Sequence, residues 1–486
     1  MKEKQKGISL FSLVAVIVSS AIGGGVFNVA NSLATAASPA GVIISWILVG
    51  IGIVALVLCL NHLVLHKPEL NGLSDYARAG FGDFVGFLSG WGYYLSSWFG
   101  NIAFAVLLMQ TTAYFLPGFQ TEKGSLTLLS ILIVSIISLG MTVIVVFGVE
   151  TAAFINAIVL IAKLVPLGLL IVTAAISFRF GIFTAHFWGN IVTNAAGVVS
   201  VSGKLTASGL VTQVKSSLMV MVWLFVGIEG AAMMANRAKK KSDAGRASVL
   251  GVTILLAIYI LLSLLPFGYL DQATLAKLQT PGFVYLMKHM VGGWGGSVMA
   301  IGLMISLIGA WLAWTMLPVE ATSQLSEQKL LSSWFDKRNK YNAPSNSLWL
   351  TEVIVQVFII VTYFFSNAYM VFVNLCTAAI MICYALVGLY SLKLGIQKKR
   401  LSISVFGLIA VVFQIFGLYM SGWQFIWLTS ILYAFGFALY YVARREHKLK
   451  ISRLEWLAMV AITAFAIFAL IALVTNHFGL RASLGL

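Results

Sequence analysis

The distribution of charged residues is the feature that most constrains how this chain can fold. Asp, Glu, Lys and Arg are absent from four long stretches, between Lys6 and Lys67, Asp83 and Glu122, Glu352 and Lys393, and Arg400 and Arg444. Each stretch has room for one or two helices of about 20 apolar residues, the length that crosses a bilayer. Charged residues make up 9% of the 486 residues, whereas ordinary soluble domains have about 25%. We therefore expect an all-α polytopic membrane protein rather than a soluble enzyme.

The apolar runs predict thirteen membrane-spanning helices. Charges, prolines and polar clusters place them near residues 8–31, 40–61, 84–115, 124–147, 152–176, 215–236, 248–269, 294–322, 348–366, 369–392, 401–420, 422–443 and 454–475. The stretches 62–83, 177–214 and 270–293 are too polar or too broken to span, so we expect surface segments there. Aromatic residues among the glycines and serines of 177–214 favour a short interfacial helix within that stretch.

The basic residues indicate the direction of these helices. With thirteen spans and a cytoplasmic N-terminus, 23 of the 31 Lys and Arg residues lie on the cytoplasmic side and seven on the opposite side. Cytoplasmic loops of membrane proteins carry such an excess. We therefore predict a multi-pass protein of the cell (plasma) membrane with an external C-terminus. The formal net charge of +16 does not indicate nucleic acid, because the basic residues form no continuous stripe.

The residues that usually carry catalysis or bind metals form no recognisable set. Cys59, Cys376 and Cys383 lie inside apolar segments, and the six histidines show no paired-ligand spacing. An enzyme needs a converging nucleophile, base or metal, so we expect no enzyme activity, no metal and no cofactor. A channel would more naturally use rings of charged residues or carbonyls.

Two of the predicted helices contain glycine clusters near their middle. Helix 8–31 contains Ile22-Gly23-Gly24-Gly25, and helix 215–236 contains Gly227-Ile228-Glu229-Gly230. Each glycine costs a continuous helix roughly 1 kcal/mol relative to alanine, so both segments favour unwinding. Unwinding frees N–H groups that suit a carboxylate and carbonyl groups that suit an ammonium group. For a single cluster the alternative is close packing between helices.

The two clusters occupy matching places in consecutive blocks of five predicted helices. The first block covers about residues 8–176 and the second about 215–392. Because five is odd, the second block must be inverted, and matched interrupted helices in inverted halves point to the central site of a transporter. We expect a transporter core in residues 1–393, followed by three C-terminal helices in residues 394–486.

The residues around these clusters resemble a known family. The segments SSAIGGGVFNVA (19–30), KPELNGLSDYARAGFGDFVGFLSGWGYYLSSWFGNIAF (67–104) and VWLFVGIEGAAM (222–233) are similar to those of the basic amino acid/polyamine antiporter family, within the amino acid, polyamine and organocation superfamily. They look most like its arginine/ornithine exchangers. The resemblance covers about the first ten or eleven helices and implies a LeuT-type fold of 5+5 inverted repeats that works by alternating access.

Glu229 and Lys163 are charged candidates within the membrane, where ionisable side chains are functional candidates by default. The structural alternatives are a counter-ion role for Glu229 toward Arg237 or Lys239, and an ion pair with a buried acid for Lys163. The resemblance implies a role in proton sensing and gating for Glu229. It also puts Lys163 where other superfamily members have a sodium site, which implies sodium-independent transport.

Trp223 and Trp314 are candidates for contact with the substrate, because aromatic faces attract alkyl-ammonium and guanidinium groups. Core packing is the alternative for each. The resemblance implies that Trp223 closes over the substrate and that Trp314, followed by Thr315, stacks on its side chain. It also matches Ser97 and Asn101 to positions that contact the distal cationic end, where helix–helix hydrogen bonding is the alternative.

Glu320 departs from the family pattern, since the arginine/agmatine exchangers have no carboxylate at this place. It is either an inner cation or proton site or an interfacial residue balanced by Lys329. On the sequence alone, Glu229 and Glu320 are expected to be the only acids at membrane depth. Phe104 also departs from the family pattern, at a place in the predicted pocket where the size and polarity of the side chain would matter.

The resulting hypothesis is an antiporter that exchanges a cationic amino acid (arginine, lysine or histidine) for its metabolic product, ornithine or a decarboxylated amine such as histamine. Proton-coupled uptake of one amino acid is the alternative within transport, and an embedded enzyme or channel is less favoured. The expected partners of the protein are small amino acids, amines and the lipid bilayer. Whether two copies form a homodimer is left open. The candidate substrate-binding residues are Ile22, Gly23, Gly24, Gly25, Ser97, Asn101, Trp223, Gly227, Trp314 and Thr315, and the proton or gating candidates are Glu229, Glu320 and Lys163.

Overall fold

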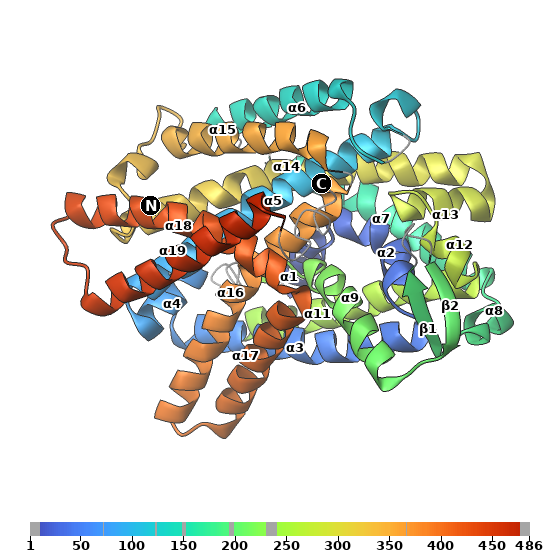
Figure 1. Ribbon diagram of the computed structural model, residues 1–486, viewed down its shortest axis with the longest axis horizontal. Helices are drawn as coiled ribbons and strands as arrows, with labels where there is room; N and C mark the ends of the chain where they lie inside the picture. The colour runs from blue at the N-terminus through green and yellow to red at the C-terminus, as the bar shows by residue number, and fades with distance from the viewer. Residues whose placement is uncertain are drawn as a thin grey trace. The chain divides into compact units, whose positions relative to one another are not determined.

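The computed structural model is predominantly helical in the residues that it describes, which are 10–70, 72–121, 124–147, 152–193, 199–229, 241–365 and 367–476 (Figure 1). The α-helices are α1 (Leu10–Ala21), α2 (Val29–Ala36), α3 (Pro39–His66), α4 (Leu73–Phe81), α5 (Asp83–Thr112), α6 (Leu128–Val146), α7 (Ala152–Ile176), α8 (Phe180–Ala185), α9 (Ala207–Trp223), α11 (Lys241–Leu264), α12 (Gln272–Ala276), α13 (Gly282–Val291), α14 (Gly293–Glu327), α15 (Ser345–Val361), α16 (Ala368–Gln397), α17 (Leu401–Ser421), α18 (Trp423–Glu446) and α19 (Arg453–Val474). Shorter 3₁₀ helices are η1 (Gly24–Asn28), η2 (Pro117–Phe119), η4 (Leu265–Gly268), η5 (Ser333–Asp336) and η6 (Thr362–Phe364). Strands β1 (Gly189–Thr193) and β2 (Val199–Lys204) form one antiparallel hairpin.

Eleven helices in the described residues are long and apolar enough to cross a membrane. They coincide with eleven of the thirteen predicted spans, which confirms an all-α polytopic membrane protein. The other two predicted spans are the first and the sixth, and both are interrupted in the structure. The total of thirteen therefore stays a prediction.

The chain divides into two compact units, each assembled from three separate stretches. Unit 1 comprises Met1–Gly72, Leu160–Leu303 and Tyr384–Met420. In it α3 packs against α9 and α11, α1 packs against α11, and α2 contacts α9 and α12. Trp46 of α3 is buried among these helices, where its ring stacks on Tyr259 and its Nε1 donates to Ser263 Oγ at 2.8 Å. The interior of unit 1 thus forms around the helices that flank the first glycine cluster.

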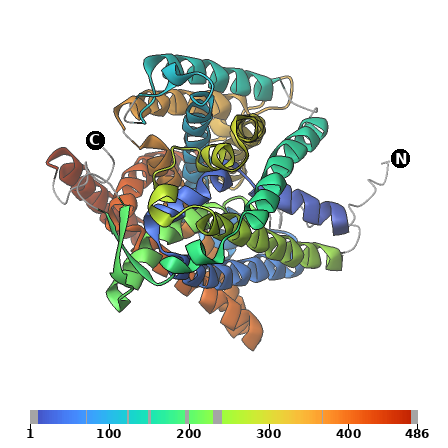
Figure 2. The same ribbon diagram turned by 90° about the vertical axis from the view of Figure 1, so that its right-hand side faces the viewer.

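Residues 177–214 include the expected short helix, α8, whose interfacial position stays a prediction. They also include the β1–β2 hairpin, seen as arrows in Figure 2, which the sequence reasoning missed. Its second strand reads Val199-Ser200-Val201-Ser202, an alternation that turns the valines to one face. Gln213 of α9 donates to the Gly189 carbonyl at 2.9 Å, and its Oε1 accepts from Ser38 Oγ at 3.0 Å, so the hairpin and the start of α3 are joined to α9.

Unit 2 comprises Leu73–Val159, Met304–Cys383 and Ser421–Leu486, and α5 is its centre. Almost every side chain of α5 is buried, and this helix contacts α4, α6, α15 and α18. Glycines on α5 permit this density: a Cβ at Gly90 would lie 2.8 Å from Cγ of Leu325 on α14. Helices α6 and α15 run side by side in both ribbon views (Figures 1 and 2).

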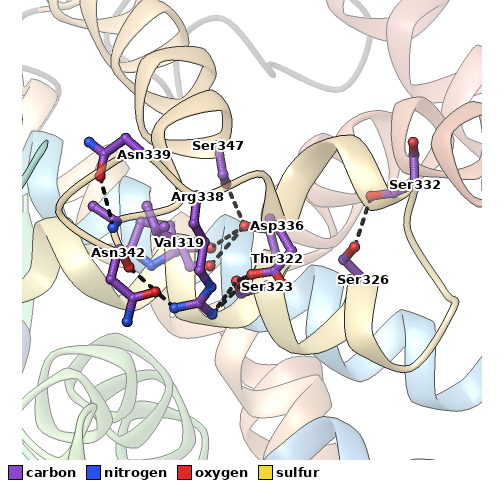
Figure 3. Close-up of polar contacts among 12 residues, drawn as sticks. Val319, Thr322, Ser323, Ser326, Ser332, Asp336, Arg338, Asn339, Asn342 and Ser347 are labelled. Carbon is purple, nitrogen blue, oxygen red and sulfur yellow. Dashed lines mark hydrogen bonds and ion pairs between the residues drawn. The ribbon is translucent and has the colours of Figure 1, made fainter.

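Polar contacts fix the end of α14 and the segment that follows it (Figure 3). Arg338 donates to Asp336 Oδ1 at 3.0 Å and to the Asn342 carbonyl at 3.3 Å. Ser326 Oγ donates to the Ser332 carbonyl at 2.9 Å. The last turn of α14, the helix that carries Trp314 and Glu320, is thereby joined to the segment that follows it.

Candidate functional site

The first predicted break is present in the structure. Helix α1 ends at Ala21, and the 3₁₀ helix η1 begins at Gly24 before α2 continues the chain. Gly25 is buried against the second broken helix, and a Cβ in its place would lie 2.6 Å from Cδ1 of Trp223. The candidates Ile22, Gly23, Gly24 and Gly25 thus form an irregular segment in contact with Trp223.

The second predicted break begins directly after Trp223, the last residue of α9. Residues 224–227 form turns, and Gly227 has a φ of 99°, a left-handed conformation that residues with a side chain rarely adopt. Helical conformation returns at Ile228 and Glu229. Gly230 and the proposed counter-ions Arg237 and Lys239 lie outside the described residues.

Two buried side chains bind peptide carbonyls at these breaks. Nζ of Lys163 donates to the Ile22 carbonyl at 3.0 Å. The Tyr259 hydroxyl lies 3.0 Å from the carbonyl oxygens of both Ala21 and Leu224 and donates its one hydrogen to either of them. Lys163 is 4% exposed and Tyr259 is fully buried. The protein itself thereby supplies partners for peptide groups that unwinding releases at membrane depth. Tyr259 was missed because a tyrosine in an apolar run looks like a core residue.

Glu229 lies buried at the second break. Its Oε2 accepts hydrogen bonds from the Gly227 N–H at 3.2 Å and from the hydroxyl of Tyr384 on α16. Tyr384 is fully buried and was not predicted from the sequence. Glu229, Gly227, Trp223 and Lys163 are thus assembled around the broken helices of unit 1.

The remaining aromatic and amide candidates lie together in unit 2. Asn101 Nδ2 on α5 donates to the Trp314 carbonyl on α14 at 3.2 Å, so the helix–helix hydrogen bond considered as its alternative is present. The Asn101 side chain is buried, and its Oδ1 has no hydrogen-bond partner among the described residues. The ring of half-buried Trp314 meets Phe104 edge to face, with centroids 5.2 Å apart.

The side chains of two other candidates in unit 2 donate hydrogen bonds to carbonyl groups of their own helices. Thr315 Oγ1 donates to the Trp311 carbonyl at 2.9 Å on α14. Ser97 lies one turn before Asn101 on α5, and its Oγ donates to the Tyr93 carbonyl at 2.7 Å. Both side chains are buried, so each satisfies its hydroxyl locally.

Glu320 and Glu352 differ from the sequence expectation. Glu320 is exposed on α14, and no ion pair within 4 Å joins it to Lys329 or to any other residue that the structure describes. Glu352 lies inside the predicted span 348–366 but was not counted among the acids at membrane depth. In the structure α15 begins at Ser345 and buries Glu352 about two turns inside an apolar span. The expectation that Glu229 and Glu320 are the only acids at membrane depth was therefore wrong.

The described residues contain no group of three or more His, Cys, Asp or Glu side chains that could hold a metal ion. The geometry instead presents peptide groups at two helix breaks, buried ionisable side chains and aromatic rings. Groups of these kinds can bind small polar ligands by hydrogen bonds and charge.

Comparison with known proteins identifies the family of the chain. A family model described as amino acid permease matches residues 8–483. The arginine/ornithine antiporter ArcD1 of Lactococcus lactis subsp. cremoris is 61% identical over 100% of this chain and 93% of its own. An arginine/ornithine antiporter of Latilactobacillus sakei is 43% identical over 94% and 95%, and an arginine/agmatine antiporter of Chlamydia felis is 33% identical over 94% and 96%. The chain belongs to the amino acid permease family, among its basic amino acid antiporters.

Proposed function

We propose that this permease is an antiporter of the plasma membrane that exchanges a cationic amino acid for its metabolic product by alternating access. Arginine and ornithine are the first pair to consider, because relatives that are 61% and 57% identical over nearly the whole chain carry the name arginine/ornithine antiporter. Lysine or histidine, with ornithine or a decarboxylated amine as the counter-substrate, fit the same chemistry.

The observation that carries the proposal is the pair of interrupted helices in unit 1. The first N–H groups of η1 and the peptide groups around Gly227 suit the carboxylate and ammonium groups shared by all α-amino acids. Trp223 packs on Gly25 at the same place, where an aromatic side chain can close over a bound ligand. Recognition of the amino acid head group is assigned to this segment.

The proposal keeps for Asn101, Ser97, Trp314 and Thr315 the contact with the distal end of the substrate that the family resemblance implies. A guanidinium or ammonium group can stack on the Trp314 ring and donate to amide and hydroxyl oxygens. Glu320, exposed on the same helix, is assigned to an inner cation or proton site.

Lys163 supports sodium-independent transport. Its ammonium group binds the Ile22 carbonyl at the first break, so a fixed positive charge already occupies this place. Glu229 is assigned to gating and proton sensing, with Tyr384 as its hydrogen-bond donor. The proposal also keeps a cytoplasmic N-terminus, a transporter core in residues 1–393 built from inverted repeats, and three C-terminal helices after it.

Counterflow in liposomes tests this function. Purified protein is reconstituted into vesicles loaded with ornithine or left empty, and uptake of labelled arginine is followed with sodium or choline outside. Loaded vesicles should take up arginine far faster than empty ones, to the same extent in both salts. Equal uptake into both kinds of vesicle rejects obligatory exchange. Uptake into empty vesicles that an inward proton gradient drives favours symport, and uptake restricted to neutral aliphatic amino acids rejects a cationic substrate.

A further inference from the structure

A small cavity inside unit 2 contains a carboxylate to which the proposed function gives no role. Residues of α5, α6, α14 and α15 line it, among them Asn101, Ser138, Thr142, Thr315 and Glu352. Its volume is about 10 Å³, room for roughly one water molecule. An arginine side chain is far larger, so in this conformation the cavity can admit a water molecule or the tip of a donor group and nothing bigger.

The carboxyl group of Glu352 accepts hydrogen bonds from donors on two helices. Ser138 Oγ and Thr142 Oγ1 of α6 donate to its Oε2 at 2.9 and 2.8 Å, and Gln356 Nε2 donates to its Oε1 at 2.6 Å. Hydrogen bonds from three donors favour the charged form of a carboxyl group. A carboxylate presents about four acceptor positions, so capacity remains for one more donor.

The charge of Glu352 has no basic partner in the part of the chain that the structure describes. The four ion pairs found there involve other residues, and Glu352 is only 4% exposed. A buried carboxylate without a counter-charge is costly, whereas its attraction for a cation is strong where water is scarce. A mobile cation that approaches this cavity is therefore stabilised.

Asn101 and Thr315 connect the cavity with the residues assigned to the distal end of the substrate. The amide nitrogen of Asn101 is bound to Trp314, while its buried Oδ1 has no hydrogen-bond partner among the described residues. Oδ1 of Asn101 and the carboxylate of Glu352 are both acceptors on one cavity, so the matching occupant is a donor. A guanidinium or ammonium N–H, or a water molecule that relays its hydrogen bond, meets this requirement.

We infer that Glu352 is the negative charge that makes the site selective for amino acids with a cationic side chain. It acts through the water-sized cavity on the guanidinium or ammonium group that lies at Asn101 and Thr315. The inference rests on the proposed function, in which these two residues contact the distal end of the substrate. Glu352 is thereby a specificity-determining residue rather than only a polar link between α6 and α15.

The test compares arginine with citrulline, which has a neutral urea group in place of the guanidinium. Glu352→Gln keeps the size of the side chain and removes its charge. In counterflow assays on the reconstituted full chain, this variant should bind arginine about tenfold more weakly, as expected for one lost interaction between partly screened charges. Its affinity for citrulline, measured by competition, should stay within about twofold of wild type or improve.

Glu446→Gln is the matched control, because it removes one carboxylate at the exposed end of α18, outside the cavity. It should leave the ratio of arginine to citrulline affinity unchanged. Glu352→Asp is an independent variant that keeps the charge on a shorter side chain, and it should retain most of the preference for arginine.

Equal losses for arginine and citrulline in Glu352→Gln would reduce Glu352 to a structural link and overturn the inference. So would loss of the arginine preference in Glu352→Asp, where the charge remains. An unchanged ratio with a shifted pH profile would mean a proton site instead, which also overturns it. Failure of the proposed function can be told apart from failure of this inference, because the wild-type protein would then exchange no cationic amino acid at all.

Discussion

At the scale of single residues, the proposed sodium independence depends on Lys163. Its ammonium group donates to the Ile22 carbonyl at the first break. Lys163→Met keeps the length of the side chain and removes the charge. Arginine exchange should fall at least about tenfold, because a carbonyl at membrane depth loses a charged donor worth about 1.5–3 kcal/mol. Sodium should not restore it, since a thioether is a poor ligand for that ion.

Counterflow in sodium and choline buffers provides the measurement for Lys163→Met. Wild-type uptake that requires sodium would contradict the role given to Lys163.

Trp314 offers a second prediction at this scale. If its ring stacks on the cationic end of the substrate, Trp314→Leu should weaken arginine binding by about 1–2 kcal/mol, roughly 5- to 30-fold. Trp456→Leu on α19, where the tryptophan is 45% exposed, is the control and should leave binding unchanged. Arginine competition in counterflow gives both values. Wild-type affinity in a folded Trp314→Leu variant would assign Trp314 to packing against Phe104.

The residue scale is also where sequence reasoning missed most. Lys163 and Glu229 stand out because charges in apolar runs are rare, but their neighbours carry no such signal. Tyr259 and Tyr384 have the pattern of core aromatics, and their role follows only from which carbonyl or carboxylate they meet. Glu352 lies inside the predicted span 348–366 but was not counted as an acid at membrane depth. The structure begins α15 earlier, at Ser345, directly after Pro344, which is a helix-start signal.

At the scale of helices and strands, the breaks in the first and sixth spans could be predicted because glycine clusters are costly in a continuous helix. The contact between them could not, since it depends on tertiary packing. The β1–β2 hairpin was missed for a different reason: its alternating segment is only a few residues long and lies among aromatic residues that favour an interfacial helix.

The contact between Gly25 of η1 and Trp223 of α9 gives a prediction at this scale. Gly25→Ala places a methyl group 2.6 Å from Cδ1 of Trp223, so the two breaks must separate or the ring must turn. Exchange should fall at least about tenfold, because misplacing binding groups by about 1 Å can cost 100-fold. Gly140→Ala on α6, where nothing lies within 4 Å of the added methyl group, should exchange normally.

Counterflow rates and size-exclusion profiles of the two alanine variants make this comparison. Normal exchange by Gly25→Ala would show that the close approach of the two breaks is dispensable.

At the scale of the whole molecule, charge segregation was enough to predict a polytopic membrane protein and most of its spans. The division into units was not predictable, because it follows contacts rather than chain order. Helices α7, α14 and α16 each pass from one unit to the other, and α17 belongs to unit 1 whereas α18 and α19 belong to unit 2. The predicted end of the transporter core at residue 393 stays a prediction.

The topology provides the prediction for the molecule as a whole. A peptide tag after Leu486 should be labelled from outside intact cells, whereas a tag inserted among the basic residues 237–246 should be labelled only after permeabilisation, because basic segments between spans stay in the cytoplasm. Labelling of both tags in intact and permeabilised cells makes the comparison. Cytoplasmic detection of the C-terminal tag would mean an even number of spans.

The hydroxyl of Tyr259 lies 3.0 Å from the last carbonyl of α1 and 3.0 Å from the carbonyl just beyond α9. A hydroxyl has a single hydrogen, so it can complete a full bond to only one of them at a time. The Ala21 carbonyl also accepts from the Gly23 N–H at 2.9 Å, so it keeps a donor when the Tyr259 hydrogen points to the Leu224 carbonyl. One buried hydroxyl thus joins the end of α1 to the chain just after α9, and any separation of these two segments breaks at least one of its two contacts.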